Sequence, residues 1–199
     1  ESYRQHSTGS NVLIAIPWMT FGGAETLIVN FCQEIKHLYN ISFITGLPSE
    51  HEWEHKFKDI SSDIYHLANL FREPRMYLEF LSNYIQSRNI QLIHIIHTSF
   101  MYDFLPELRR RHPQVKVVVT LFNDRAHFIE GVASHKFIDG FTSDNKRVVD
   151  HYTSEVPETQ LTRVIPNGIN CSEVYNPSNY DRQKERATLG LLEDELAIF

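Results

Sequence analysis

The stretch AIPWMTFGGAETLIVNF, residues 15–31, runs from the end of an apolar segment through a short loop into an amphipathic helix. The segment that enters it, NVLIAI at 11–16, is short and continuously apolar, which is typical of a strand covered on both faces of a parallel sheet. The loop ends in Gly22-Gly23, and apolar side chains then recur at helical spacing. The stretch therefore predicts a buried first strand, a tight loop and a helix over 24–39.

Strand-like and helix-like segments alternate along the rest of the chain. Further strands are predicted at 41–45, 63–67, 91–97, 115–122, 136–143 and 162–166. Further helices are predicted at 74–89, 100–112, 126–135, 145–155 and 182–190. The polar segment 49–63 is predicted to be a loop with a weak helix. Because the connections are long enough for crossover helices, the alternation favours an α/β fold with a doubly wound parallel sheet.

Length and composition limit the number of domains and the class of protein. With 199 residues, of which 42% are hydrophobic and 22% charged, the chain suits one domain followed by the start of another. We place the first domain at 1–170 and assign 171–199 to an interdomain linker and the beginning of a second domain. The net charge of −6 gives no overall basic field, so nucleic acid is not an expected partner.

Cysteine use and hydropathy bear on the compartment. The two cysteines, Cys32 and Cys171, form neither a disulfide framework nor a metal-ligand pair, which favours a reducing, cytoplasmic setting. No run of about 18 apolar residues is long enough to span a bilayer. The chain lacks an initiator Met and stops in a strand-like segment, LAIF at 196–199. We therefore expect it to be a piece of a longer protein.

The glycine pair marks the expected ligand site. In open parallel sheets, ligands bind beyond the carboxyl ends of the strands, where the free N–H groups of a helix's first turn receive phosphate well. Two glycines allow close approach of the backbone and a positive φ. The alternative is that Gly22-Gly23 only makes a tight turn while Glu25 only complements the helix dipole. Neither the G-x-G-x-x-G fingerprint nor a P-loop is present.

Three sequence features together carry a resemblance to a known family. GGAE at 22–25, VIPNGIN at 164–170 and a later Asn-Pro at 176–177 stand on an α/β background. The chain, from 11 to 199, resembles the amino-terminal half of GT-B-fold retaining glycosyltransferases. This large family includes glycogen synthases, sucrose synthases and bacterial lipopolysaccharide and capsule transferases. The resemblance implies one Rossmann-like half of a two-domain GT-B fold, with the acceptor received mainly by this half.

The resemblance also implies what the protein does. It implies transfer of a sugar from a nucleotide-diphosphate sugar to a hydroxyl of a glycan or lipid-linked saccharide, with retention and without a metal or other cofactor. The donor diphosphate would lie near Gly22, Gly23 and Ala24, and Asn167-Gly168 would form the hinge. The LAIF segment would begin the donor domain, so the fragment alone is expected to be an inactive part of a hexosyltransferase of polysaccharide biosynthesis.

The family pattern also points to candidate catalytic residues, with one departure. Relatives often place a histidine in a T-x-H arrangement after the strand that corresponds to 115–122, whereas this chain has Phe122 there. His97, Asn123, Asp124 and His127 are the nearby polar candidates. His94 and His97 differ by an odd number, so in a strand they point to opposite faces and do not form a metal pair.

Two further features are candidates for acceptor and membrane contacts. Trp18, Met19 and Phe21 flank the glycine pair and either bind an acceptor's lipid or sugar ring or tuck into the core. The basic run at 109–112 either complements a helix dipole or draws the protein to the inner face of the membrane as a peripheral enzyme.

Two other functions remain open on the same fold. A non-catalytic sugar- or protein-binding module would explain Phe122 at the position where relatives often have a histidine. A nucleotide-sugar epimerase would use ionisable residues in the crevice for proton transfer, for which His97, Asp124 and His127 are the candidates.

Overall fold

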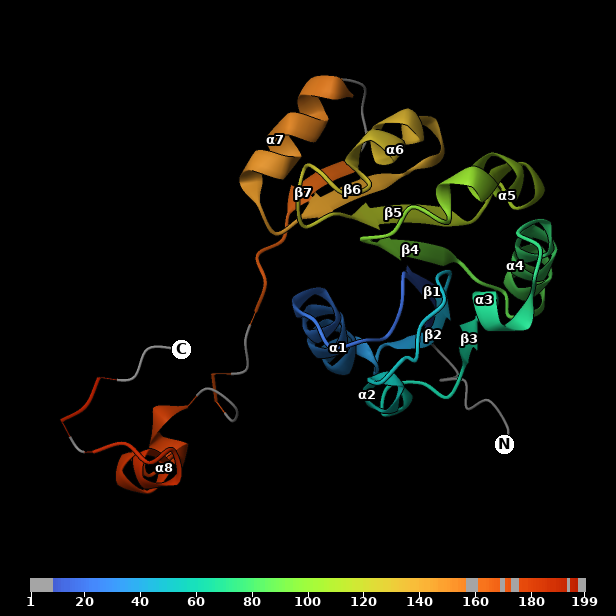
Figure 1. Ribbon diagram of the computed structural model, residues 1–199. Coiled ribbons are helices and arrows are strands. Elements are labelled where there is room, and N and C mark those ends of the chain that lie inside the picture. Colours follow the sequence, from blue (N-terminus) through green and yellow to red (C-terminus); the bar gives the residue numbers. More distant parts are fainter. Residues whose placement is uncertain (1–8, 157–160, 169–170, 173–175, 193, 197–199) are drawn as a thin grey trace. The chain divides into compact units, whose positions relative to one another are not determined.

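The computed structural model describes residues 9–156, 161–168, 171–172, 176–192 and 194–196 (Figure 1). The chain divides into two compact units, Glu1–Asn167 and Gly168–Phe199. In the second unit, helix α8 (Arg182–Thr188) begins after Asp181, whose Oδ1 accepts hydrogen bonds from the backbone N–H groups of residues 183 and 184. Most of the segment predicted to begin a donor domain, at 197–199, lies outside the described residues.

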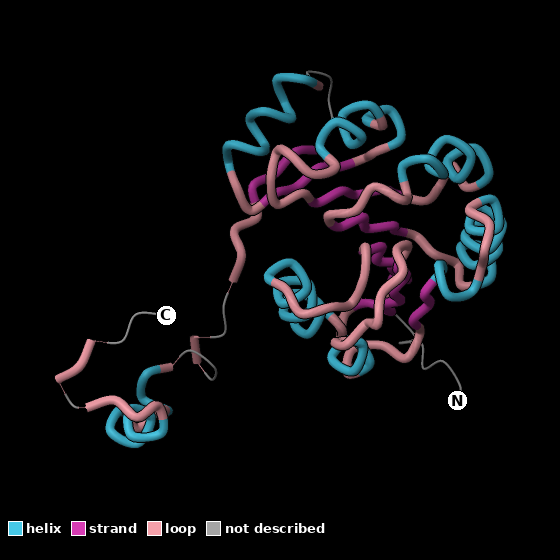
Figure 2. Tube along the Cα trace, viewed as in Figure 1, coloured by secondary structure: helices cyan, strands magenta, loops and turns pink. Residues whose placement is uncertain are grey.

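The first unit is built on a single parallel sheet of seven strands in the order β3-β2-β1-β4-β5-β6-β7 (Figure 2). The strands are β1 (Ser10–Ile16), β2 (Tyr39–Thr45), β3 (Ile64–His66), β4 (Leu92–Ile96), β5 (Lys116–Thr120), β6 (Gly140–Ser143) and β7 (Leu161–Val164). The predicted doubly wound parallel sheet is confirmed. Its strand order reverses between β1 and β4, which lie side by side with Val12 opposite Leu92.

Helices cover both faces of this sheet (Figure 1). They are α1 (Gly23–Ile35), α2 (Glu54–Lys58), α3 (Leu67–Leu70), α4 (Arg75–Ser87), α5 (Leu105–Arg111), α6 (Phe128–Ala133) and α7 (Lys146–Glu155). Alternate residues of β1 enter different cores. Leu13 packs in a cluster with side chains of α4, α5 and α7, and Ile14 packs in a cluster with side chains of α1 and α2. This explains why the strand is apolar at every position.

Several predicted boundaries are wrong by a few residues. The first helix ends at Ile35 instead of residue 39, because Tyr39 already pairs with Ser10 as the first residue of β2. The strand predicted at 136–143 is only Gly140–Ser143, preceded by a 3-10 turn. The polar segment 49–63 contains the short helix α2. Within the described part of the chain, no helix combines the length and the apolar character that crossing a bilayer requires.

Candidate functional site

The site lies where the strand order of the sheet reverses. All seven strands are parallel, so their carboxyl ends share one edge, and β1 and β4 are neighbours there. Beyond β1 the chain forms residues 17–23, called the glycine loop, and enters α1. Beyond β4 the next residue is His97. This switch point is the place where open α/β sheets bind ligands.

Gly22 and Gly23 have different structural roles. Gly22 is the N-cap of α1 with φ −174°, an extended conformation open to any residue, and the only positive-φ glycine among the described residues is Gly190. The positive φ that glycine permits is therefore not used at Gly22 or Gly23. A Cβ on Gly22 would overlap the carboxylate of Glu25, which is 5% exposed, whereas a Cβ on Gly23 would meet no atom within 4 Å. Gly22 makes room for a side chain, and Gly23 faces open space.

The first turn of α1 leaves its amides available. Gly22 has no side chain to cap the helix, and its carbonyl accepts from the amide and the hydroxyl of Thr26 at 3.0 and 2.8 Å. Within the described residues, the amides of Gly23, Ala24 and Glu25 donate no hydrogen bond. Unpaired N–H groups at a helix N-terminus carry partial positive charge and favour an anion.

The crowding between Gly22 and Glu25 has a measurable consequence. We expect Gly22→Ala to lower the free energy of unfolding by about 1 kcal/mol, since the Glu25 side chain has to leave its rotamer. In a Glu25→Ala background the same substitution should cost less, because the carboxylate is absent. Urea unfolding of the four proteins of this cycle measures the coupling. An equal cost of Gly22→Ala in both backgrounds would contradict the assigned contact.

The three large apolar residues of the glycine loop differ in exposure. Phe21 is 83% exposed and Trp18 38% exposed, whereas Met19 is fully buried in the core beneath α1. Met19 is therefore not available to an acceptor, and that part of the prediction is wrong. Trp53, which the sequence did not single out, packs edge-on against Phe21 with ring centroids 5.0 Å apart. The exposed Phe21 ring therefore rests on the half-buried Trp53 ring beside the glycine loop.

Two histidines meet at the carboxyl edge. The rings of His97, after β4, and His127, before α6, lie edge-to-face with centroids 5.4 Å apart, and Phe122 lies 5.5 Å from His97. Both histidines have left-handed backbones, with φ 47° and 63°. Such strain is uncommon in residues other than glycine and clusters at functional sites. Within the described residues, the buried Nδ1 of His97 has no hydrogen-bond partner.

The surroundings favour neutral rings in this pair. Burial, followed by the proximity of His127, lowers the pKa of His97. Burial lowers the pKa of His127 as well, although Glu130 acts in the opposite direction. Since the unperturbed value is 6.5, both rings are neutral at pH 7. Each can then donate one hydrogen bond and accept another.

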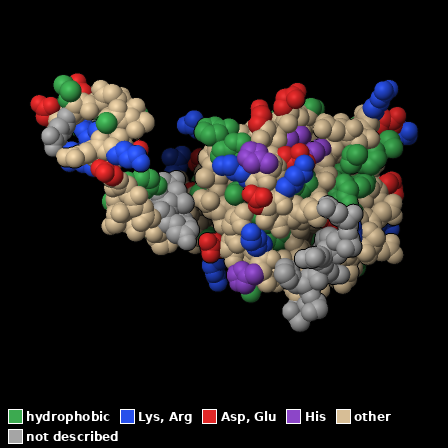
Figure 3. Space-filling view, turned by 90° about the horizontal axis from the view of Figure 1, so that it is seen from below, with side chains coloured by type: hydrophobic (Ala, Val, Ile, Leu, Met, Phe, Trp, Pro, Cys, Tyr) green, Lys and Arg blue, Asp and Glu red, His purple; other side chains and the backbone are tan. Residues whose placement is uncertain are grey.

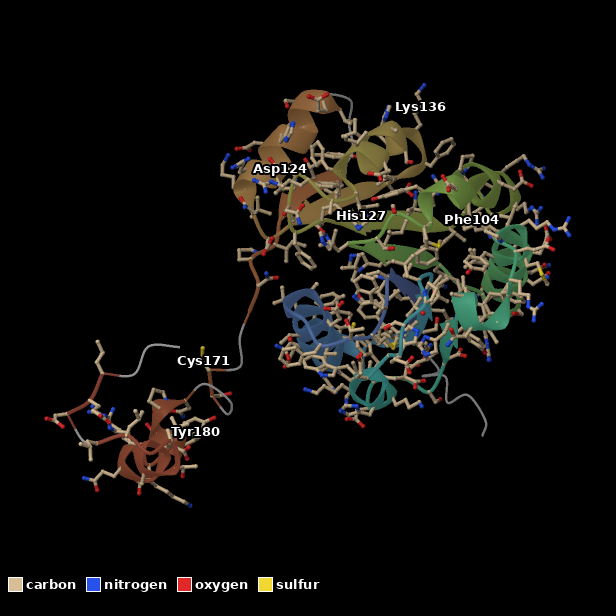
Figure 4. The ribbon with its side chains drawn as sticks, viewed as in Figure 1. Phe104, Asp124, His127, Lys136, Cys171 and Tyr180 are labelled. Atoms are coloured by element: carbon tan, nitrogen blue, oxygen red, sulfur yellow. The ribbon has the colours of Figure 1, made fainter. Side chains whose placement is uncertain are left out.

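The other two catalytic candidates have structural partners. Asn123 Oδ1 accepts from the amides of Arg125 and Ala126 at 3.0 and 2.9 Å, so the side chain closes a turn. Asp124 contacts α7, where its Oδ2 lies 3.0 Å from Arg147 Nη2 and 3.4 Å from His151 Nδ1 (Figure 4). Desolvation opposes ionisation, but the hydrogen bond and charge of Arg147 prevail and lower the pKa of Asp124. We therefore centre the candidate site on the histidine pair.

His94 is engaged within the sheet. Its Nε2 lies 2.8 Å from Thr120 Oγ1, which in turn lies 2.5 Å from Thr142 Oγ1, so the contacts cross three neighbouring strands. Burial lowers the pKa of His94 to about 4. This environment gives His94 a structural role within the sheet. Within the described residues, no group of three histidine, cysteine or acidic side chains is arranged to hold a metal ion.

The basic run at 109–112 is matched by acidic residues. Its ion pairs are Arg109 with Asp139 at 3.1 Å, Arg110 with Glu107 at 2.6 Å and Arg111 with Glu79 at 2.9 Å. On the face that Figure 3 displays, acidic, basic and histidine side chains are likewise interspersed. Because each arginine has an acidic partner, the run is not the unopposed cationic patch that membrane recruitment favours.

The predicted hinge lies at the end of the first unit. Asn167 is the last residue of that unit, and its Nδ2 donates to Asp144 Oδ2 at 2.5 Å, which ties the segment after β7 to the loop after β6. Gly168 opens the second unit, and a Cβ there would meet no atom within 4 Å. Bending at these two residues stays a prediction.

Comparison with known proteins bears on the fold. No protein-family model matches the sequence, and no curated protein matches it significantly. A solved glycosyltransferase from Rickettsia africae matches with TM-score 0.66 and 14% identity, over 94% of this chain and 51% of that one. Anabaena HepE, solved with UDP and glucose, matches with TM-score 0.63 and 14% identity, over 91% of this chain and 50% of that one.

The chain has the fold of one half of a GT-B protein. It spans about half the length of each of these solved structures, consistent with an amino-terminal domain. A UDP-N-acetylglucosamine 2-epimerase shares the architecture as well, with TM-score 0.59 and 12% identity, over 80% of this chain and 48% of that one. The GT-B fold implied by the sequence is thus confirmed, and it is common to transferases and epimerases of nucleotide sugars.

Proposed function

We propose that this chain is the acceptor-side domain of a retaining glycosyltransferase. The whole protein would transfer a sugar from a nucleotide-diphosphate sugar to a hydroxyl of a glycan or lipid-linked saccharide, on the cytoplasmic side of the membrane and without a metal or other cofactor. The donor domain is supplied by the other half of the fold, so the 199-residue chain alone is inactive. HepE, solved with UDP and glucose, is a neighbour that supports nucleotide-sugar chemistry on this architecture.

The observation that carries the proposal is the open first turn of α1. Three of its amides donate to no described residue, and Gly23 leaves the space before them without a Cβ. A diphosphate that leaves a sugar gains negative charge, and preorganised amides aimed at that charge stabilise the transition state. The position of this turn at the switch point supports its use for the donor.

The neighbouring groups fit a sugar and its acceptor. The neutral rings of His97 and His127 can exchange hydrogen bonds with sugar hydroxyls. Phe21 is exposed and offers an apolar ring, on which a sugar ring or the apolar part of a lipid-linked acceptor can pack, while Trp53 supports it from the side and carries the Lys56 ammonium 3.9 Å from its ring centroid. Trp18 is partly exposed in the same loop and is a further apolar side chain available to an acceptor.

Release of free nucleoside diphosphate tests the proposal. The whole protein is incubated with a panel of nucleotide sugars and hydroxyl acceptors, with the 199-residue chain as control. We expect the whole protein alone to release nucleoside diphosphate and to form a glycosylated acceptor whose anomeric configuration matches the donor. If a folded protein releases no nucleoside diphosphate with any donor, the result would favour a non-catalytic binding module. The supporting observation for such a module is Phe122 beside His97.

Epimerisation of a nucleotide sugar is the second candidate. The His97–His127 pair favours it, because two adjacent ionisable rings can move protons, and a UDP-N-acetylglucosamine 2-epimerase shares the fold. The same incubation distinguishes the two reactions. A transferase consumes the donor only with an acceptor that becomes glycosylated, whereas an epimerase changes the configuration of the nucleotide sugar when no acceptor is present.

A further inference from the structure

A second loop holds the glycine loop in place. Residues 46–53, called the second loop, follow β2 and make three hydrogen bonds to the glycine loop. Leu47 N donates to Pro17 O at 3.1 Å, and Trp53 N donates to Met19 O at 3.0 Å. The third bond uses a side chain, since Met19 N donates to Nδ1 of His51 at 3.2 Å. Only this third contact depends on the chemistry of one side chain.

His51 is buried and strained at this position. It is 5% exposed and has φ 52°, in the left-handed region that only a few per cent of residues other than glycine adopt, chiefly asparagine, aspartate and histidine. A backbone N–H can only donate, so Nδ1 accepts and the ring carries its proton on Nε2. Within the described residues, the buried Nε2 has no hydrogen-bond partner. Such strain and burial persist where surrounding contacts hold the residue in place.

A second histidine stacks on His51. The ring of His66, at the end of β3, lies 3.7 Å from the ring of His51 between centroids, with an interplanar angle of 19°. His66 is held by Thr45, whose Oγ1 is 2.9 Å from its Nδ1. Glu54 Oε1 lies 3.4 Å from its Nε2, which is an ion pair only when the ring is protonated. Two stacked imidazoles cannot both be charged without strong repulsion.

We infer that His51 is the positioning residue of the glycine loop. Its neutral ring holds the loop through the amide of Met19, and the loop is released when the ring gains a proton. Protonation places an N–H on Nδ1, where it faces the N–H of Met19, so attraction becomes repulsion. The inference rests on the proposed function only in assigning the glycine loop to the donor. The order of the loop can be measured without any donor.

The groups around His51 set the direction of its titration. They are His66 from β3, Glu54 from α2, and Glu50 and Glu52 from the second loop. Burial and then His66 lower the pKa of His51 below 6.5, and the three glutamates act in the opposite direction without reversing the shift. The neutral ring and the stability it contributes are therefore fully present above pH 6.5. They are lost as the pH falls through the folded-state pKa.

Hydrogen exchange of the Met19 amide tests the inference on the 199-residue chain by two-dimensional NMR. We expect His51→Ala to lower the protection factor of this amide about tenfold, as loss of one hydrogen bond does. His51→Asn is the matched control, because asparagine tolerates the left-handed backbone and its Oδ1 can accept from the Met19 amide. Protection in His51→Asn should remain within about threefold of the parent chain.

The pH dependence separates positioning from a merely structural role. As the pH falls from about 7.5 through the folded-state pKa of His51, which lies below 6.5, the parent chain should lose Met19 protection while His51→Asn, which does not titrate, keeps it. An unprotected Met19 amide in the parent chain would overturn the inference, as would equal pH profiles of the two proteins. If His51→Ala does not fold, the comparison of the parent chain with His51→Asn still decides the matter. None of these readouts involves sugar transfer.

Discussion

Gly23→Val in the whole protein is expected to lower kcat/KM for the donor by about 100-fold, the loss seen when a preorganised donor to a developing oxyanion is removed. Gly23 is the first residue of α1, and a Cβ there meets no atom within 4 Å. A branched side chain would enter that open space without clashing with the protein. It would occupy the place of the ligand and separate an incoming diphosphate from the amides of the first turn.

The matched control introduces valine elsewhere on the same helix. Asn30 is an exposed residue of α1, and asparagine and valine have similar helix propensities, so Asn30→Val should leave turnover unchanged. Thermal unfolding of both variants should stay close to that of the parent protein. Full donor turnover in a folded Gly23→Val protein would remove the glycine loop from the donor site. If turnover and the amount of folded protein fall together, the substitution acts by destabilising α1 and not by blocking the ligand.

Much of this fold could be predicted from the sequence, because the apolar pattern within each short segment determines whether that segment forms a strand or a helix. NVLIAI is apolar at every position because β1 packs in one core through Leu13 and in another through Ile14. The spacing of apolar residues after the glycines likewise predicts α1. The end of α1 was missed because it is set by pairing: Tyr39 is taken up by β2 opposite Ser10. Hydrophobic spacing within the helix does not contain that information.

The candidate site was only partly predictable. The glycine pair and the two histidines were found because they follow strands, and parallel strands end at one edge. Asp124 was chosen for its chemistry, yet its partner Arg147 lies 23 residues further along the chain. A local sequence pattern does not predict a contact between residues so far apart in the chain. The sequence left open whether Met19 binds an acceptor or enters the core, because its amide partner His51 lies 32 residues further along, in a polar segment predicted as a loop with a weak helix.

The two glycines illustrate how one motif can serve two purposes. Two glycines allow a group to approach the backbone closely. At Gly22 that group belongs to the protein, since the carboxylate of Glu25 occupies the space that a Cβ would take. At Gly23 nothing of the described protein fills the space. A binding role therefore belongs to the second glycine, and substitutions at the two positions should affect different properties: stability at Gly22 and donor use at Gly23.

The double substitution His97→Ala/His127→Ala is expected to reduce kcat/KM of the whole protein about 100-fold, because two hydrogen bonds to the sugar, each of about 1.4 kcal/mol, are lost together. The two rings touch, so the single variants should not add independently. The measurement is donor turnover at saturating acceptor. His37→Ala/His55→Ala serves as the control because it removes two exposed histidines and should leave turnover unchanged.

The size and the pH profile of that loss distinguish the two candidate reactions. If the rings only bind sugar hydroxyls, turnover of the parent protein falls as the pH drops through their lowered pKa values, since a protonated ring can no longer accept. If they move protons in an epimerase, the double variant loses its activity to a greater extent, by about 10³-fold or more. A double variant with unchanged turnover would show that the strained pair lies outside the reaction. The open first turn of α1 and the aromatic side chains of the acceptor surface would then be the parts of the proposed site left to test.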